Sequence, residues 1–96
     1  MNRSVVIVKS PKRREYAVIR IHWNYGQPLA DWLVTEYGSW DKAYELICQG
    51  HRNTIEEAYR EPEHQVFRTL RNAKEWFEHL TLAYHDGKRW RFEHKG

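Results

Sequence analysis

The pattern of apolar and polar positions near the start of the chain predicts two neighbouring strands. Residues Ser4 to Lys9 form a β-branched run with an entirely apolar centre, which is typical of a strand covered on both faces. Apolar and polar side chains then alternate from Glu15 to Trp23. The connection between the two runs is short, so an antiparallel hairpin is expected. The alternation predicts that one face of the second strand carries Ala17, Ile19, Ile21 and Trp23.

Two short helices are predicted directly after this hairpin. Pro28 suits the first turn of one helix, and Gly38 is expected to end it in the left-handed conformation. Ser39 is placed to cap the next helix, which Gly50 ends. Because a single Gly-Ser junction separates the helices, they are expected to meet at a sharp corner, and the stretch Ile19–Gly50 is interpreted as the scaffold of the fold. The period of the apolar residues predicts two buried stripes: Leu29, Trp32, Leu33 and Tyr37, then Trp40, Ala43, Tyr44 and Ile47.

The stretch after Gly50 carries weaker signals. Thr54 to Glu57 fits a capping box, which predicts one helical turn, and residues 59–65 are expected to form an exposed loop. Val66 to Leu70 is consistent with a short strand. A second capping box, Asn72 with Glu75, predicts a helix whose inward-facing residues are Ala73, Trp76, Phe77 and Leu80.

The last segment predicts a second hairpin, because Asp86-Gly87 separates two runs of alternating or aromatic residues. A two-residue turn there pairs Ala83 with Trp90 and Thr81 with Phe92. Together the elements predict a single α+β domain spanning residues 1–96. We expect a small two-layer sandwich, with an antiparallel sheet built from the N- and C-terminal β-hairpins and about three helices on one face.

Composition narrows the class of protein. The 96 residues suffice for one domain, 30% of them are charged, and no apolar run approaches the length of a membrane span. The N-terminal apolar run, Val5 to Val8, is too short for the core of a signal peptide. The single cysteine, Cys48, is expected to be a buried or half-buried thiol in a reducing compartment. The sequence therefore predicts a cytoplasmic protein without a membrane partner.

Candidate catalytic and metal-binding residues are scattered. The six histidines form no zinc-type spacing, the serines lack a nucleophile elbow, and no glycine-rich loop could cradle a phosphate. The sequence thus predicts a protein that is not an enzyme and that uses no cofactor, metal or small-molecule substrate. His22 lies at a strand end where a cleft could open, although a structural histidine that hydrogen-bonds to the nearby turn is the favoured interpretation.

Two basic segments with interleaved aromatic residues are the main candidates for binding. Their cations are Lys9, Lys12, Arg13 and Arg14 in the first segment, and Lys88, Arg89 and Arg91 in the second. The net charge of +3 permits an anionic partner without requiring one. Alternation of the arginines with Trp90 and Phe92 favours an ordinary solvated strand over a nucleic-acid groove. If both hairpin tips lay at the same end of the sheet, however, they would form one positive edge.

Several short motifs together resemble a family of small uncharacterised phage and prophage proteins. They are His22-Trp23, Gly26, Leu29, Leu33, Tyr37-Gly38-Ser39, the run from Asp41 to Ile47, Gly50, and Tyr84 with Asp86-Gly87 and Trp90. The resemblance implies a mobile-element context. By extrapolation from small phage proteins without catalytic motifs, we expect an inhibitor of host defence of the anti-CRISPR type. Such an inhibitor binds and blocks a host protein or ribonucleoprotein complex in the host cytoplasm by protein-protein contact.

The expected contact residues combine the two basic segments with the turn at His22 and Tyr25. A second interpretation is a nucleic-acid-binding accessory protein that uses the basic hairpin tips. Affinity for DNA or RNA that falls steeply with salt distinguishes the second interpretation from the first.

Overall fold

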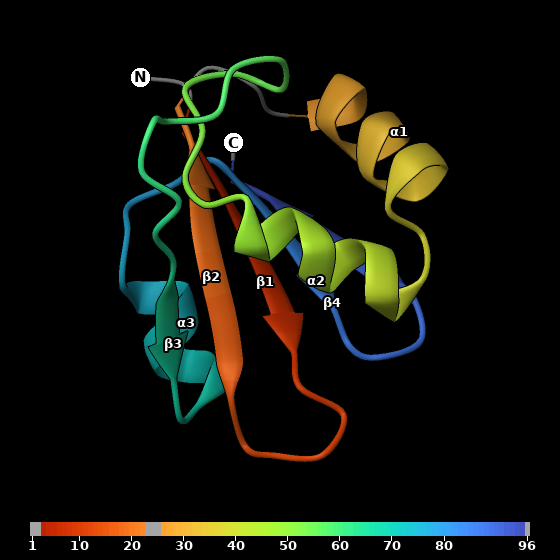
Figure 1. Ribbon diagram of the computed structural model, residues 1–96, viewed down its shortest axis with the longest axis vertical. Helices are drawn as coiled ribbons and strands as arrows, with labels where there is room; N and C mark the ends of the chain where they lie inside the picture. Colours follow the sequence, from red (N-terminus) through yellow and green to blue (C-terminus); the bar gives the residue numbers. More distant parts are fainter. Residues whose placement is uncertain (1–2, 23–25, 96) are drawn as a thin grey trace.

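A five-stranded sheet forms the centre of the computed structural model, which describes residues 3–22 and 26–95 (Figure 1). The strands of this described part follow the spatial order β3-β2-β1-β4-β5. Their bounds are β1 Ser4–Lys9, β2 Tyr16–Ile21, β3 Gln65–Phe67, β4 Thr81–His85 and β5 Trp90–His94. The helices are α1 Gly26–Glu36, α2 Trp40–Cys48 and α3 Leu70–Glu75. The predicted α+β class is confirmed.

The sheet is mixed, whereas the sequence led us to expect an antiparallel one. β1 pairs with β2, β2 with β3 and β4 with β5 in antiparallel fashion, but β1 and β4 run parallel, with Ser4 opposite Thr81 and Val8 opposite His85. The cause is the path of the chain after α3. Residues 76–80 return it to the end of the sheet where β1 begins, and there the Leu80 amide donates to the Arg3 carbonyl at 2.8 Å.

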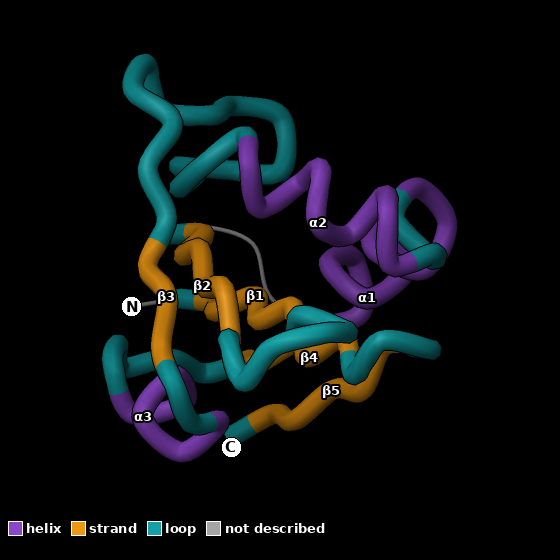
Figure 2. The backbone as a smooth tube through the Cα atoms, turned by 60° about the horizontal axis from the view of Figure 1, so that its bottom comes forward, coloured by secondary structure: helices purple, strands orange, loops and turns teal. Residues whose placement is uncertain are grey.

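Helices cover both faces of the sheet, so the expectation of three helices on one face is wrong. Figure 2 shows α1 and α2 on one side and α3 on the other. The reason lies in β1, where Val6 and Val8 join the core under α1 and α2 while Val5 and Ile7 join the core under α3. An all-apolar strand needs cover on both faces, as its sequence predicted.

The corner between α1 and α2 forms where the sequence placed it. Ser39 caps α2, with its Oγ accepting from the Lys42 amide at 3.3 Å. Two details differ from expectation. Gly38 does not adopt a positive φ, although a side chain there would meet the Val34 carbonyl at 3.0 Å. In α2 the fully buried leucine is Leu46, while Tyr44 is exposed, because the helix packs on the sheet through residues 43, 46 and 47.

Between α2 and β3 the chain runs without a helix, although the cap residue acts as expected. Thr54 Oγ1 accepts from the Glu56 and Glu57 amides at 3.2 and 3.1 Å, but no helical turn follows it. The buried Arg52 holds this segment by donating to the Thr54 and Ile55 carbonyls at 3.3 and 2.6 Å. Of the loop predicted at residues 59–65, residues 59–63 are exposed as expected, whereas His64 is half-buried and Gln65 begins β3.

Three further sequence expectations are corrected. The cap of α3 is Thr69, whose Oγ1 accepts from the Asn72 amide at 3.1 Å, so the helix begins before Asn72. The short strand predicted at Val66–Leu70 is β3, which instead spans Gln65–Phe67. Cys48 is exposed, because the last turn of α2 directs it away from the sheet.

The C-terminal hairpin has a four-residue connection, Asp86 to Arg89, instead of the expected two-residue turn. His85 pairs with Trp90 and Ala83 with Phe92, a shift of two residues from the predicted register. A shift of two keeps every side chain on its expected face.

No helix within the described ranges is long and apolar enough to cross a membrane.

Candidate functional site

Both basic hairpin tips lie at the same end of the sheet. β1 leads into the first tip and β4 into the second, and because these strands are parallel neighbours, both turns leave the sheet at its lower end in Figure 1. Arg68 lies at this end too, since it follows Phe67, which pairs with Tyr16 at the start of β2. We call residues 9–15, 68 and 86–91 the basic end. The sequence predicted one positive edge only if both hairpin tips lay at the same end of the sheet, and the structure places them there.

The basic end carries eight cationic side chains and two carboxylates. Both carboxylates have cationic partners: Glu15 lies 3.9 Å from Arg13, and Asp86 lies 2.9 Å from Arg91. Among the described residues, no ion pair involves the remaining six cations, and all of them except the half-buried Lys9 are exposed. These six are Lys9, Lys12, Arg14, Arg68, Lys88 and Arg89. The end therefore presents uncompensated positive charge to solvent.

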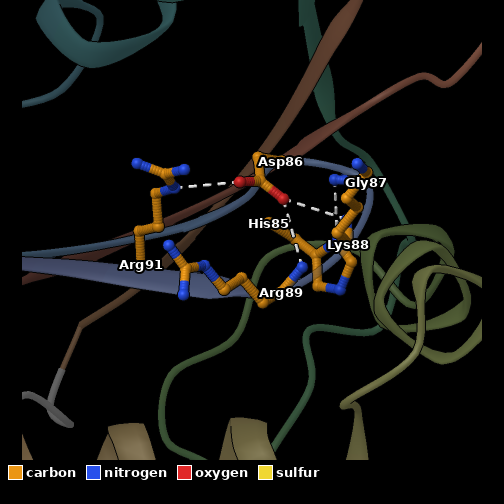
Figure 3. A network of polar contacts seen from close by, with 6 residues as sticks. All are labelled: His85, Asp86, Gly87, Lys88, Arg89 and Arg91. Atoms are coloured by element: carbon orange, nitrogen blue, oxygen red, sulfur yellow. Dashed lines mark hydrogen bonds and ion pairs between the residues drawn. The ribbon is translucent and has the colours of Figure 1, made fainter.

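The second tip is ordered by its only acidic side chain (Figure 3). Asp86 Oδ1 accepts from the amides of Lys88 and Arg89 at 2.9 and 3.1 Å, and Oδ2 accepts from Arg91 Nε at 2.9 Å. The two backbone hydrogen bonds, followed by the Arg91 hydrogen bond and charge, hold the pKa of Asp86 well below its usual range. The carboxylate thus fixes the turn that presents Lys88 and Arg89.

Ring N–H groups tie this end of the sheet to the helical corner. Trp90 Nε1 donates to the Tyr37 carbonyl at 2.8 Å, and His85 Nε2 lies 2.9 Å from the Gly38 carbonyl. Because the Gly87 amide donates to His85 Nδ1 at 3.2 Å, the proton of the neutral ring is assigned to Nε2, which donates to Gly38. These bonds satisfy carbonyls at the end of α1, which lack partners within the helix.

A shallow groove of about 260 Å³ lies beside the first tip, between α2 and β3. Its aromatic wall is Trp40 stacked on Tyr44, with ring centroids 5.1 Å apart and ring planes inclined by 17°. Trp40 Nε1 donates to the Lys9 carbonyl at 2.7 Å, which fixes the indole against the loop. Tyr44 is 37% exposed and Val66 52% exposed. The groove is lined by Val8, Ser10, Arg13, Glu15, Ala17, Trp40, Tyr44 and Val66.

His22 lies at the opposite end of the sheet, about 20 Å away by the length of a six-residue strand. Its ring stacks on Tyr59 and meets Phe77 edge-on, both with centroids 6.1 Å away. Burial lowers the pKa of His22, and the charges of Arg20 and Arg3 lower it further. Both guanidinium groups lie over the Phe77 ring, 5.2 Å from its centroid. His22 therefore belongs to a packed aromatic and cationic cluster.

The structure thus divides the residues that the sequence nominated. It brings Lys9, Lys12, Arg13, Arg14, Lys88, Arg89 and Arg91 to one end and leaves His22 at the other, while Tyr25 lies outside the described residues. Sequence reasoning missed Arg68, Tyr44 and Val66. Tyr44 was assigned to the buried stripe of α2, and only the packing of that helix reveals its exposure.

Residues 3–22 and 26–95 contain no group of three or more His, Cys, Asp or Glu side chains placed to hold a metal ion. The basic end combines cations with aromatic rings. Its chemistry is suited to binding an anionic surface.

Comparison with models of protein families, with curated proteins and with solved structures found no match for this chain.

Proposed function

We propose that this chain is a non-enzymatic binding protein of a phage or related mobile element. In this proposal its basic end docks, in the host cytoplasm, on a ribonucleoprotein complex of the CRISPR-effector type and blocks it. The observation that carries the proposal is the parallel pairing of β1 and β4, which gathers two basic tips into one surface. The resemblance to small phage proteins supports the mobile-element context.

The charge distribution suits an anionic partner. Six cations of the basic end have no carboxylate partner among the described residues, so an incoming anionic surface does not have to displace an existing ion pair to reach them. Uncompensated charge of one sign also speeds encounter with an oppositely charged partner. Phosphate groups of a bound guide RNA and acidic patches of its protein subunits are both suitable contacts.

The basic end is also held in place before binding. Asp86 orders the second tip, and Trp40 Nε1 holds the Lys9 carbonyl at the base of the first. A surface that is ordered in the free protein loses less conformational entropy on association. This favours specific docking over diffuse attraction.

Capture of an effector complex from host lysate tests the proposal. The full chain is expected to retain a CRISPR effector complex after nuclease treatment of exposed nucleic acid, and phage that express it are expected to escape that defence. The variant Lys12→Glu/Arg14→Glu should weaken capture by about tenfold or more through lost steering and contact. Capture of nothing by the wild-type chain, together with no protection of phage, refutes the proposal.

A matched variant separates the local effect from the change in net charge. Arg60→Glu/Lys95→Glu reverses two cations outside the basic end and alters the net charge by the same amount. Its capture of the complex is expected to equal that of the wild type. Equal losses in both double variants would show that total charge, and not the basic end, determines binding.

A nucleic-acid-binding accessory protein is the second candidate, favoured by the exposed Tyr44 ring, which stacks on the half-buried Trp40 beside the cations. It predicts that the protein binds free DNA or RNA, with a logarithmic affinity that falls linearly with the logarithm of salt concentration. Capture of the effector complex that disappears on nuclease treatment would favour this candidate over the first.

A further inference from the structure

We propose that the Trp40–Tyr44 stack and its neighbouring groove form a stacking site for one unpaired base of single-stranded nucleic acid. This inference rests on the proposed role of the basic end as the docking surface, and it names the chemical feature of the partner that this surface recognises. It commits to an unpaired nucleotide of the bound guide RNA that the complex protects from nuclease, not to a peptide of its protein subunits.

The aromatic pair has the properties of a fixed platform. Trp40 is the first residue of α2, and Tyr44 stands one turn later on the same face of the helix. The indole cannot turn freely, because its Nε1 donates to the Lys9 carbonyl at 2.7 Å and its ring packs against the core under α1 and α2. Tyr44 lies nearly parallel to it and remains 37% exposed. A ring held in this way offers a π-face to an incoming base at little cost in side-chain entropy.

The groove beside the platform has the size and lining for one base. Its volume of about 260 Å³ falls just below the range of pockets that hold whole drug-sized ligands. Val8, Ala17 and Val66 supply apolar walls, since Val66 pairs with Ala17 across the β2–β3 ladder and shares its face. Val66 is 52% exposed because α2 does not reach over β3. A flat heterocycle would cover this apolar surface.

Phosphate contacts are available along the rim. Arg13 lines the groove, and within the described ranges its one ion pair is the 3.9 Å contact with Glu15, with 76% of its own side chain exposed. Such an exposed pair contributes little and is easily exchanged for a phosphate. Lys12 and Arg14 flank Arg13, and Arg68 follows the strand that carries Val66. Cations beside an exposed ring form the combination by which proteins hold single-stranded nucleic acid.

Binding of short labelled oligonucleotides tests the inference. The probes are a twelve-nucleotide oligouridylate, the matching oligothymidylate, and an abasic strand of equal length that keeps the phosphates but lacks the bases. The wild-type chain is expected to bind the strands with bases about tenfold more tightly than the abasic strand, because stacking of one base on an aromatic ring contributes about that much affinity. The two sugar types show whether RNA or DNA is preferred.

Variants at Tyr44 identify the platform. Tyr44→Ala should lose the preference for strands with bases while keeping the wild-type dependence on salt, because the phosphate contacts are unchanged. Tyr44→Phe should retain both, because it keeps the ring. Thermal melting of each variant verifies folding, and the wild-type comparison of abasic with base-containing strands keeps the test decisive if the alanine variant is unstable.

Two results overturn the inference. Equal affinity of the wild type for abasic and base-containing strands shows that no base is stacked, and an unchanged preference in Tyr44→Ala shows that stacking occurs elsewhere. If the protein binds no oligonucleotide yet still captures a nuclease-treated effector complex through Lys12 and Arg14, the stacking site fails while the proposed function stands. If neither binding occurs, the proposed function fails as well.

Discussion

Acidification should destabilise this protein through one buried histidine, His51. The ring is only 6% exposed, and its Nδ1 accepts a hydrogen bond from the Arg20 amide at 3.1 Å. It also stacks on Trp76, with centroids 5.6 Å apart. Burial, followed by the charges of Arg20, His64 and His22, lowers the pKa of His51 to about 4. Protonation of Nδ1 would both bury a charge and remove the acceptor for the Arg20 amide.

The sign and size of the effect follow from linkage. The pKa of His51 is lower in the folded state than the ordinary value of 6.5, so the unfolded chain binds the proton first as the pH falls. The stability of the folded state is therefore complete above pH 6.5 and is lost progressively toward pH 4. The difference in pKa corresponds to a loss of about 2 kcal/mol at pH 5 and about 3 kcal/mol at pH 4 relative to neutral pH. This is a large fraction of the stability of a small domain.

Urea denaturation followed by tryptophan fluorescence measures this loss at a series of pH values between 7.5 and 4, chosen to span the titration of His51. His51→Asn is the matched variant, because the asparagine Oδ1 can accept from the Arg20 amide without taking up a proton. Its stability should decline by about 2 kcal/mol less than that of the wild type between neutral pH and pH 5. Other titrating groups are common to both proteins and cancel in the comparison.

The reasoning is refuted if the wild type and His51→Asn lose stability in parallel as the pH falls. A direct NMR titration provides the second check. The imidazole signals of His51 should stay in their neutral form until the pH approaches 4, with the proton on Nε2. Titration of this ring near pH 6.5 would show that it is neither buried nor bonded as described.

Two substitutions test the backbone of the site and of its scaffold. Asp86→Ala removes the acceptor for the Lys88 and Arg89 amides, so it should lower the free energy of unfolding by about 1 kcal/mol in urea denaturation and weaken capture of the partner. An unchanged stability would show that the turn is ordered without the carboxylate. Gly50→Ala should lower the free energy of unfolding by about 2 kcal/mol or more, because Gly50 has a φ of 85° and a side chain there would approach the Pro62 Cα to 2.7 Å. A melting temperature equal to that of the wild type would refute this prediction.

The sequence alone determined the local structure. The β-branched run of β1 predicted a strand covered on both faces, and the alternation in β2 assigned Ala17, Ile19 and Ile21 to one side. Ser39 marked the start of α2 because a serine side chain can accept from a free helix amide. Asp86-Gly87 likewise located a turn, although the carboxylate of Asp86 lengthened it to four residues. These features depend on neighbours within a few positions of the chain.

Only the tertiary structure decided what the candidate site is. The pattern of β1 and β4 gave each strand its faces, but not the parallel pairing that brings both basic tips to one end. That pairing depends on residues 76–80, which return the chain past α3 to the start of β1. There the Leu80 amide donates a hydrogen bond to the Arg3 carbonyl. The exposure of Tyr44 and the burial of His51 are likewise set by packing between distant elements. Hydrophobic period determines which residues share a face, whereas long-range contacts determine which faces, ends and side chains meet.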